Sequence, residues 1–162
     1  MSGIVTGAER EAAVAQWLIC AVQASERRAV WQDWTQRGAA LMPCGVLFSG
    51  VKITARTVTA AAGSEDVDAY LARVIQGPVI CTQNGRSYVA LVGPSVARRW
   101  KVPGVSMLGD GAFLGVPRPS LDRASGASAF WAVPFDSPGM LCMGHDVEHV
   151  VEAGRRGGPA CG

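Results

Sequence analysis

Apolar residues return at two different spacings along the chain, and the spacing predicts which segments are helical. Steps of three and four residues place apolar side chains on one face of a helix. Serine or threonine stands ahead of several such segments, where a hydroxyl can accept a hydrogen bond from a free backbone N–H group. The pattern predicts helices over residues 7–24, 26–36, 55–62, 65–76 and 146–153, the first four capped by Thr6 with Glu9, Ser25, Thr54 and Ser64.

Shorter apolar runs, bounded by glycine, proline and polar residues, predict strands. Asn84-Gly85 separates two of these runs and is typical of a hairpin turn, because both residues tolerate positive φ. Gly109-Asp110-Gly111 separates two more, which we expect to pair with each other until Pro117 and Pro119 end the ladder. The predicted strands cover residues 39–42, 46–48, 51–53, 79–81, 88–92, 105–108, 112–116 and 130–133.

Together these elements predict an α+β fold, in which helices flank a largely antiparallel central sheet. A chain of 162 residues without a long linker is most simply a single domain, residues 1–162. Within it we expect an N-terminal helical extension over residues 1–25, an α+β core over residues 28–154 and a flexible, glycine-rich tail over residues 155–162.

The composition agrees with a globular domain and limits the partners and the cellular compartment that we expect for it. Apolar residues make up 49% of the chain and charged residues 17%, and the net charge of +2 is small for a dedicated nucleic-acid-binding protein. The five cysteines follow no metal-binding spacing and, without a signal peptide, indicate reduced thiols in the cytoplasm. No apolar run approaches the roughly 18 residues of a membrane span, so we expect no membrane partner.

Three segments carry a family resemblance. Gly85-Arg86-Ser87-Tyr88-Val89 is similar to a strand motif with glycine, histidine and an aromatic residue. Residues 105–120, VSMLGDGAFLGVPRPS, are similar to a later motif rich in glycine and proline, and residues 34–43 resemble an opening helix, glycine, strand and proline. On these segments the chain resembles the bacterial primase–polymerase domains related to archaeo-eukaryotic primases.

The resemblance implies a polymerase fold whose enzymes hold a metal-bound triphosphate with an Asp-x-Asp strand, a histidine and a further aspartate. Here Ser87 stands near the histidine position and Ser106 at the later aspartate position, while Asp66-Val67-Asp68 falls at a predicted helix start. Serine does not replace a carboxylate in the oxygen shell of Mg²⁺. We therefore expect a non-catalytic domain with no metal and no cofactor. The alternative is a true nucleotidyltransferase with other ligands.

His145-Asp146-Val147-Glu148-His149 spells H-x-x-E-H, the order of an inverted zinc-peptidase motif. Histidines four residues apart on a helix can face one metal, and Cys142 could supply a third ligand. Only thirteen residues follow, and Glu152 is the sole acid among them. We interpret the segment as a solvated amphipathic helix, with metal binding as the alternative.

Arg98-Arg99-Trp100-Lys101 combines cations that can contact phosphate with a ring that can stack on a base. Arg86 and Arg118 are candidates for the same side of the molecule. The residues predicted to bind single-stranded nucleic acid or a nucleotide are Arg86, Arg98, Arg99, Trp100, Lys101 and Arg118. The alternative for this segment is a solvated turn with Trp100 in the core.

Low charge and high apolar content also favour a second hypothesis, a protein-interaction or regulatory module with no nucleic-acid role. Its partner would be another protein or a second copy of the chain. The contact would use the helices that carry Trp17, Trp31 and Trp34, or an exposed sheet edge. The sequence does not choose between these two hypotheses.

Overall fold

The computed structural model describes residues 7–157, which form six α-helices, seven strands and three short 3₁₀ turns. The helices are α1 (Gly7–Leu18), α2 (Arg27–Arg37), α3 (Ala55–Ala62), α4 (Val67–Val74), α5 (Pro94–Arg98) and α6 (Gly144–Gly157). The strands are β1 (Ala39–Pro43), β2 (Ser49–Thr54), β3 (Val79–Thr82), β4 (Ser87–Val92), β5 (Ser106–Leu108), β6 (Phe113–Pro117) and β7 (Phe130–Val133). The 3₁₀ turns are η1 (Ile19–Ala21), η2 (Ala24–Glu26) and η3 (Arg123–Ser125).

Five strands form the central sheet in the order β5-β2-β4-β3-β7, and every neighbouring pair is antiparallel. Strands β1 and β6 form a separate antiparallel pair, here named the β1–β6 ribbon. Strand β4 lies in the middle of the central sheet, and all six of its residues are buried. The predicted α+β class, with a largely antiparallel sheet and flanking helices, is confirmed.

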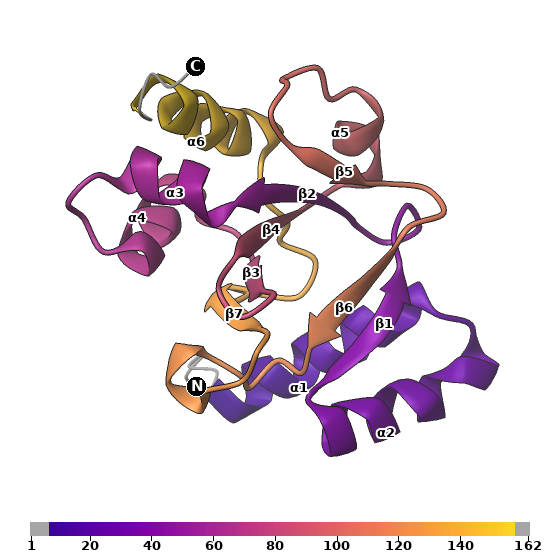
Figure 1. Ribbon diagram of the computed structural model, residues 1–162. Helices are drawn as coiled ribbons and strands as arrows, with labels where there is room; N and C mark the ends of the chain where they lie inside the picture. The colour runs from indigo at the N-terminus through magenta and orange to yellow at the C-terminus, as the bar shows by residue number, and fades with distance from the viewer. Residues whose placement is uncertain (1–6, 158–162) are drawn as a thin grey trace, which may run out of the picture.

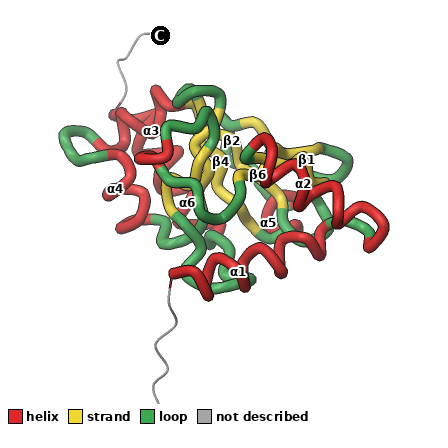
Figure 2. Tube along the Cα trace, turned by 90° about the horizontal axis from the view of Figure 1, so that it is seen from below, coloured by secondary structure: helices red, strands yellow, loops and turns green. Residues whose placement is uncertain are grey.

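The central sheet is covered on both faces. Helices α3, α4 and α6 lie on one side, and α1, α2 and the β1–β6 ribbon lie on the other (Figure 1). Seen from below, α1 runs across the molecule toward α2 and the ribbon (Figure 2). On the helix side the core includes Val51, Ile53, Tyr88, Ala90, Val58, Leu71, Val147 and Val150. On the ribbon side it includes Ile80, Val89, Leu91, Leu18, Trp34, Met42, Leu114 and Val116.

Several local predictions are confirmed by the structure. Thr54 caps α3 by accepting a hydrogen bond from the Thr57 backbone N–H at 3.3 Å, and Gly38 ends α2 with a left-handed φ of 81°. The β3–β4 hairpin forms as expected, with positive φ at Gln83 and Asn84 as well as at Gly85. The left-handed stretch therefore begins one residue earlier than the Asn-Gly pattern predicts.

Other predictions were wrong. β5 and β6 do not pair with each other across Gly109-Asp110-Gly111, because β5 pairs with β2 and β6 pairs with β1. Asp66, not Ser64, caps α4, since its carboxylate reaches the Ala69 N–H at 3.0 Å. Residues 155–157 belong to α6, so the expected tail begins inside a helix. The rest of that tail, and Thr6 of the expected capping box, lie outside the described residues.

Candidate binding surfaces

The six predicted binding residues are not gathered on one surface. Arg86 lies in the β3–β4 turn, at the start of β4, whereas Arg98, Arg99 and Lys101 follow the other end of β4 through α5. Six residues of extended strand separate these ends by about 20 Å. Arg118 follows β6, in the other sheet. Figure 1 shows α5 and the far end of β6 on different parts of the molecule.

The side chain of Arg118 is half-buried and hydrogen-bonded to the fold. Its guanidinium donates to the Trp34 carbonyl at 3.1 Å and to the Ser120 hydroxyl at 3.2 Å. The Arg118 backbone N–H also donates to the Gly38 carbonyl at 2.8 Å. The side chain therefore fastens the end of β6 to the end of α2, and it is less available for a ligand than the sequence suggests.

Arg98 also has protein partners. Its guanidinium lies 3.4 Å from each carboxylate oxygen of Asp110 and 3.4 Å from the Gly45 carbonyl. These contacts connect α5 to the Gly109-Asp110-Gly111 turn and to the loop after β1. Both side chains are largely exposed, so the pair is screened by solvent and contributes little to stability.

The segment after α5 keeps two exposed cations, Arg99 and Lys101, on either side of a half-buried Trp100. The Trp100 indole N–H donates to the Val102 carbonyl at 2.6 Å, and its ring packs against the helix-side core. The following loop approaches the last turn of α6, where a Cβ atom added at Gly104 would lie 3.2 Å from the Arg155 side chain. The cations available on this surface are therefore Arg99, Lys101 and Arg155.

A second polar surface appears on the ribbon-facing side of the central sheet. Strand register places Ser106 opposite Lys52, and places Thr82 and Thr54 on either side of Ser87. Directly opposed residues, and residues two apart on a strand, share one face of a sheet. Ser87, Lys52 and Ser106 therefore lie on the same face. Lys52 is half-buried and Ser87 is buried, with its hydroxyl 3.1 Å from the Gln83 side chain.

Sequence patterns did not indicate a partly exposed polar network on the opposite face of the central sheet, where the Arg123 side chain is 54% exposed and that of Asp68 24%. Arg123 in η3 donates two hydrogen bonds to Asp68 in α4, at 2.6 and 2.8 Å, and one to the Tyr88 hydroxyl at 3.3 Å. Its guanidinium also lies 4.8 Å from the Phe130 ring centre. The hydrogen bonds to Asp68 raise the pKa of Arg123, and burial raises the pKa of Tyr88. Asp68 and Arg123 are 55 residues apart, so no local pattern links them.

The H-x-x-E-H residues do not converge on a metal position with Cys142. His145 and His149 are exposed on α6, whereas Cys142 is buried and its thiol donates to the Pro78 carbonyl at 3.2 Å. Burial raises the pKa of the Cys142 thiol to about 12. Within residues 7–157, no group of three or more His, Cys, Asp or Glu side chains could hold a metal ion.

The three tryptophans proposed for protein contact pack mainly inside the fold. Trp34 is buried and its N–H donates to the Val116 carbonyl at 2.9 Å, while Trp17 packs edge-on against Phe135. Trp31 packs edge-on against Trp34 and is 38% exposed. These side chains form part of the ribbon-side core or lie against it.

Large exposed apolar side chains gather instead around the outer face of the β1–β6 ribbon. Leu41 is 68% exposed, Val46 66% and Phe113 63%. With Pro43 they line one wall of a groove of about 660 Å³, here named the ribbon groove. The other wall comes from residues 20–33, in η1, η2 and α2, and includes Val22 and Val30. The sequence signal for this surface is the run Ala40-Leu41-Met42, which is apolar on both faces of its strand.

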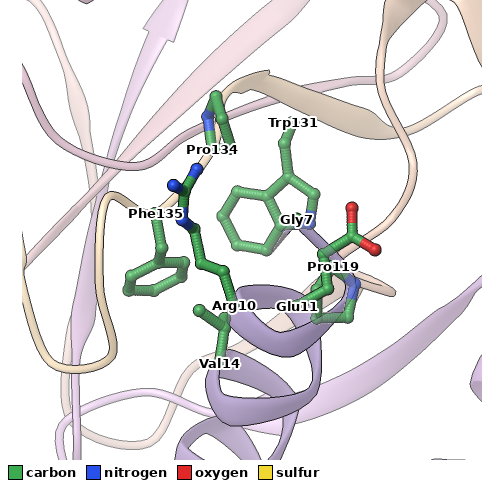
Figure 3. Close-up of a pocket in the computed structure, with 8 residues that line it drawn as sticks. All are labelled: Gly7, Arg10, Glu11, Val14, Pro119, Trp131, Pro134 and Phe135. Carbon is green, nitrogen blue, oxygen red and sulfur yellow. The ribbon is translucent and has the colours of Figure 1, made fainter. Parts of the chain in front are cut away.

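A smaller hollow lies between α1 and the segment that follows β7 (Figure 3). Trp131, Pro134 and Phe135 form one side, and Arg10 extends toward Pro134 from α1. The hollow measures about 110 Å³. Ligand pockets usually have roughly 300 Å³ or more, so we assign no ligand to it.

None of the described helices is both long and apolar enough to cross a bilayer. No family model, no curated protein and no solved structure matches the chain.

Proposed function

We propose that the chain is a non-catalytic binding domain whose main partner is a protein, bound in the ribbon groove. The observation that carries this proposal is the exposure of Leu41, Val46 and Phe113 around one groove. Covering a fully exposed Val, Leu or Phe side chain contributes about 1.5–3 kcal/mol. Leu41, Val46 and Phe113 are 63–68% exposed, so covering the three together can offset much of the entropy lost on association.

The scaffold of the groove supports the same proposal. β1 and β6 are hydrogen-bonded over five residue pairs, and the Trp34 N–H fastens α2 to the Val116 carbonyl of β6. Most of the lining therefore belongs to packed secondary structure, whereas Val46 lies in the loop after β1. A preformed surface loses little conformational entropy when a partner binds, which favours affinity.

A selection experiment tests the proposal without a known partner. Random peptides of about 12 residues would be displayed on phage, selected on the full chain and counter-selected on the double variant Leu41→Ser/Phe113→Ser. Met143→Ser is the matched control, because Met143 is an exposed apolar residue outside the groove lining. We expect peptides that bind the wild type and Met143→Ser but not the double variant. Failure to enrich such peptides would overturn the proposal.

A second candidate function is weak binding of a nucleotide or single-stranded nucleic acid by a primase–polymerase-like domain. It is supported by the shared face of Ser87, Lys52 and Ser106. The two serines stand at the positions where the resembled polymerases hold a histidine and an aspartate, and Lys52 lies beside Ser106. A half-buried lysine attracts phosphate more strongly than an exposed one, because the local dielectric is lower.

Anisotropy of a labelled single-stranded oligonucleotide and of a labelled nucleoside triphosphate, at low and moderate salt, tests this second candidate. We expect salt-sensitive binding that Lys52→Ala weakens at least about tenfold. Arg99→Ala/Lys101→Ala is the control for the surface after α5. Loss of binding only in that control would transfer the site to the α5 surface and overturn the sheet-face assignment. No binding at low salt would overturn both.

A further inference from the structure

We infer that the partner of the ribbon groove is a polypeptide segment that carries apolar side chains together with lysine or arginine. The inference rests on the proposed protein-binding function and adds the charge of the partner. It follows from the polar groups that stand beside the apolar wall.

Two carboxylates face the groove. Glu26 ends η2 and Asp33 lies in α2, and both belong to the groove lining. Seven residues, or two helical turns, separate them, so they lie on one side of the helix. Within residues 7–157 neither carboxylate takes part in a hydrogen bond or ion pair, and the described lining includes no lysine or arginine.

The two carboxylates make the groove selective for a cationic partner, although the net charge of the chain is +2. A basic segment gains no attraction from the protein as a whole, so its electrostatic attraction must come from nearby groups. Carboxylates at the rim of an apolar contact favour a cationic partner and repel an anionic one. Glu26 and Asp33 would therefore accept lysine or arginine while Leu41 and Phe113 contact the apolar side chains.

The same charges argue against two other occupants. A symmetric dimer through this surface would place two copies of one acidic groove against each other, with no cation in the described lining to compensate. A nucleic acid would bring its phosphates toward Glu26 and Asp33. Both arrangements bring like charges together, which a basic segment avoids.

Cys20 provides a reporter at the groove. It lines the groove and is exposed, whereas Cys44, Cys81 and Cys142 are buried. In a Cys161→Ser background, a thiol reagent should therefore modify Cys20 first. A bound segment should slow this reaction.

The direct test uses three labelled peptides of about 14 residues, or roughly four helical turns. The first carries leucine at steps of three and four residues with lysine elsewhere. The second replaces leucine by serine, and the third replaces lysine by glutamate. We expect the Leu/Lys peptide to bind the full chain at least about tenfold more tightly than either control, and to slow Cys20 modification.

Charge-reversal variants complete the test. Glu26→Lys/Asp33→Lys should lose at least about tenfold in affinity for the Leu/Lys peptide, whereas Glu152→Lys, on exposed α6 surface, should not. Equal binding of the Leu/Glu peptide, or concentration-dependent dimers that protect Cys20, would overturn the basic partner and leave the protein-binding function in place. No binding of the Leu/Lys peptide would also overturn it, while the phage selection decides the function independently.

Discussion

The two sides of the central sheet are covered in different ways. On the helix side, α3, α4 and α6 turn apolar stripes onto the sheet, and their outer surfaces are mostly polar. On the ribbon side, the inner face of the β1–β6 ribbon packs on the core through Met42 and Leu114, while its outer face exposes Leu41 and Phe113. An apolar outer face adds nothing to the fold itself, so the ribbon side is the part of the molecule suited to a partner.

The largest expected effect contrasts two leucines. Leu91 is fully buried in β4, so Leu91→Ala should lower the free energy of unfolding by about 2–5 kcal/mol. Leu41→Ala, on the outer face of the ribbon, should change it by no more than about 0.5 kcal/mol. Urea denaturation of the two variants measures both values. Similar losses would show that the outer face of the ribbon is covered within the chain and is not free for a partner.

Two glycines, Gly154 on the helix side and Gly115 on the ribbon, also differ in the space around them. A Cβ atom at Gly154 of α6 would collide with the Thr57 carbonyl of α3, so Gly154→Ala should destabilise the protein by about 1–3 kcal/mol. Gly115, on the outer face of the ribbon, has open space at the same position. Gly115→Ala should therefore be nearly neutral in the same denaturation experiment. A destabilised Gly115→Ala variant would contradict the exposure of that face.

Alkaline pH should affect the two sides unequally. Burial raises the pKa of the Cys142 thiol on the helix side to about 12, and that of the Cys44 thiol on the ribbon side to about 11. The folded state holds these protons more tightly than the unfolded state. The contribution of the two thiols to the free energy of unfolding is therefore fully present below pH about 9, and it is lost as pH rises toward the two raised pKa values. The slope is at most about 1.4 kcal/mol per pH unit for each thiol.

Denaturation between pH 8 and about pH 12 under reducing conditions measures this slope. Cys142→Ala and Cys44→Ala should each flatten the profile, and above pH about 11 Cys142→Ala should flatten it more. An unchanged slope in both variants would show that other groups cause the alkaline loss of stability.

The smallest expected effect concerns how the end of the ribbon is held. Arg118→Ala removes the hydrogen bonds to Trp34 and Ser120, and should cost about 1 kcal/mol. Arg99→Ala, on the surface after α5, should leave stability unchanged. If Arg118→Ala is also neutral, the arginine does not fasten β6 to α2, and it becomes available again as a binding residue.

Predictions from the sequence succeeded where the signal is local. The β3–β4 hairpin follows from a turn between two apolar runs, and β7 was predicted with its observed bounds, residues 130–133. The partner strands of β5 and β6 could not be predicted from the sequence, because the choice of partner depends on the whole sheet. Strand β5 adds to the edge of the central sheet beside β2, although β6 is its neighbour in sequence.

The site predictions have the same limit. Arg118 resembles a surface cation in the sequence, but its partner, the Trp34 carbonyl, is 84 residues away. Ala40-Leu41-Met42 reads as a strand buried on both faces, and only the three-dimensional arrangement leaves the side of Leu41 uncovered. Lys52 could have been found by strand alternation, since it lies between Val51 and Ile53 and must face away from them.

The register of the β1–β6 ribbon has a consequence during synthesis. Pro43 pairs with Phe113, so β1 leaves the ribosome long before its partner strand exists. At about 5–20 residues per second, the intervening chain takes roughly 4–14 s to translate. Throughout that interval Leu41 and Met42 belong to an unpaired nascent segment that a chaperone can bind. Truncated translation products that stop before β6 would lack Phe113 and the partner strand of β1, so only a polypeptide that includes β6 could form the complete ribbon groove.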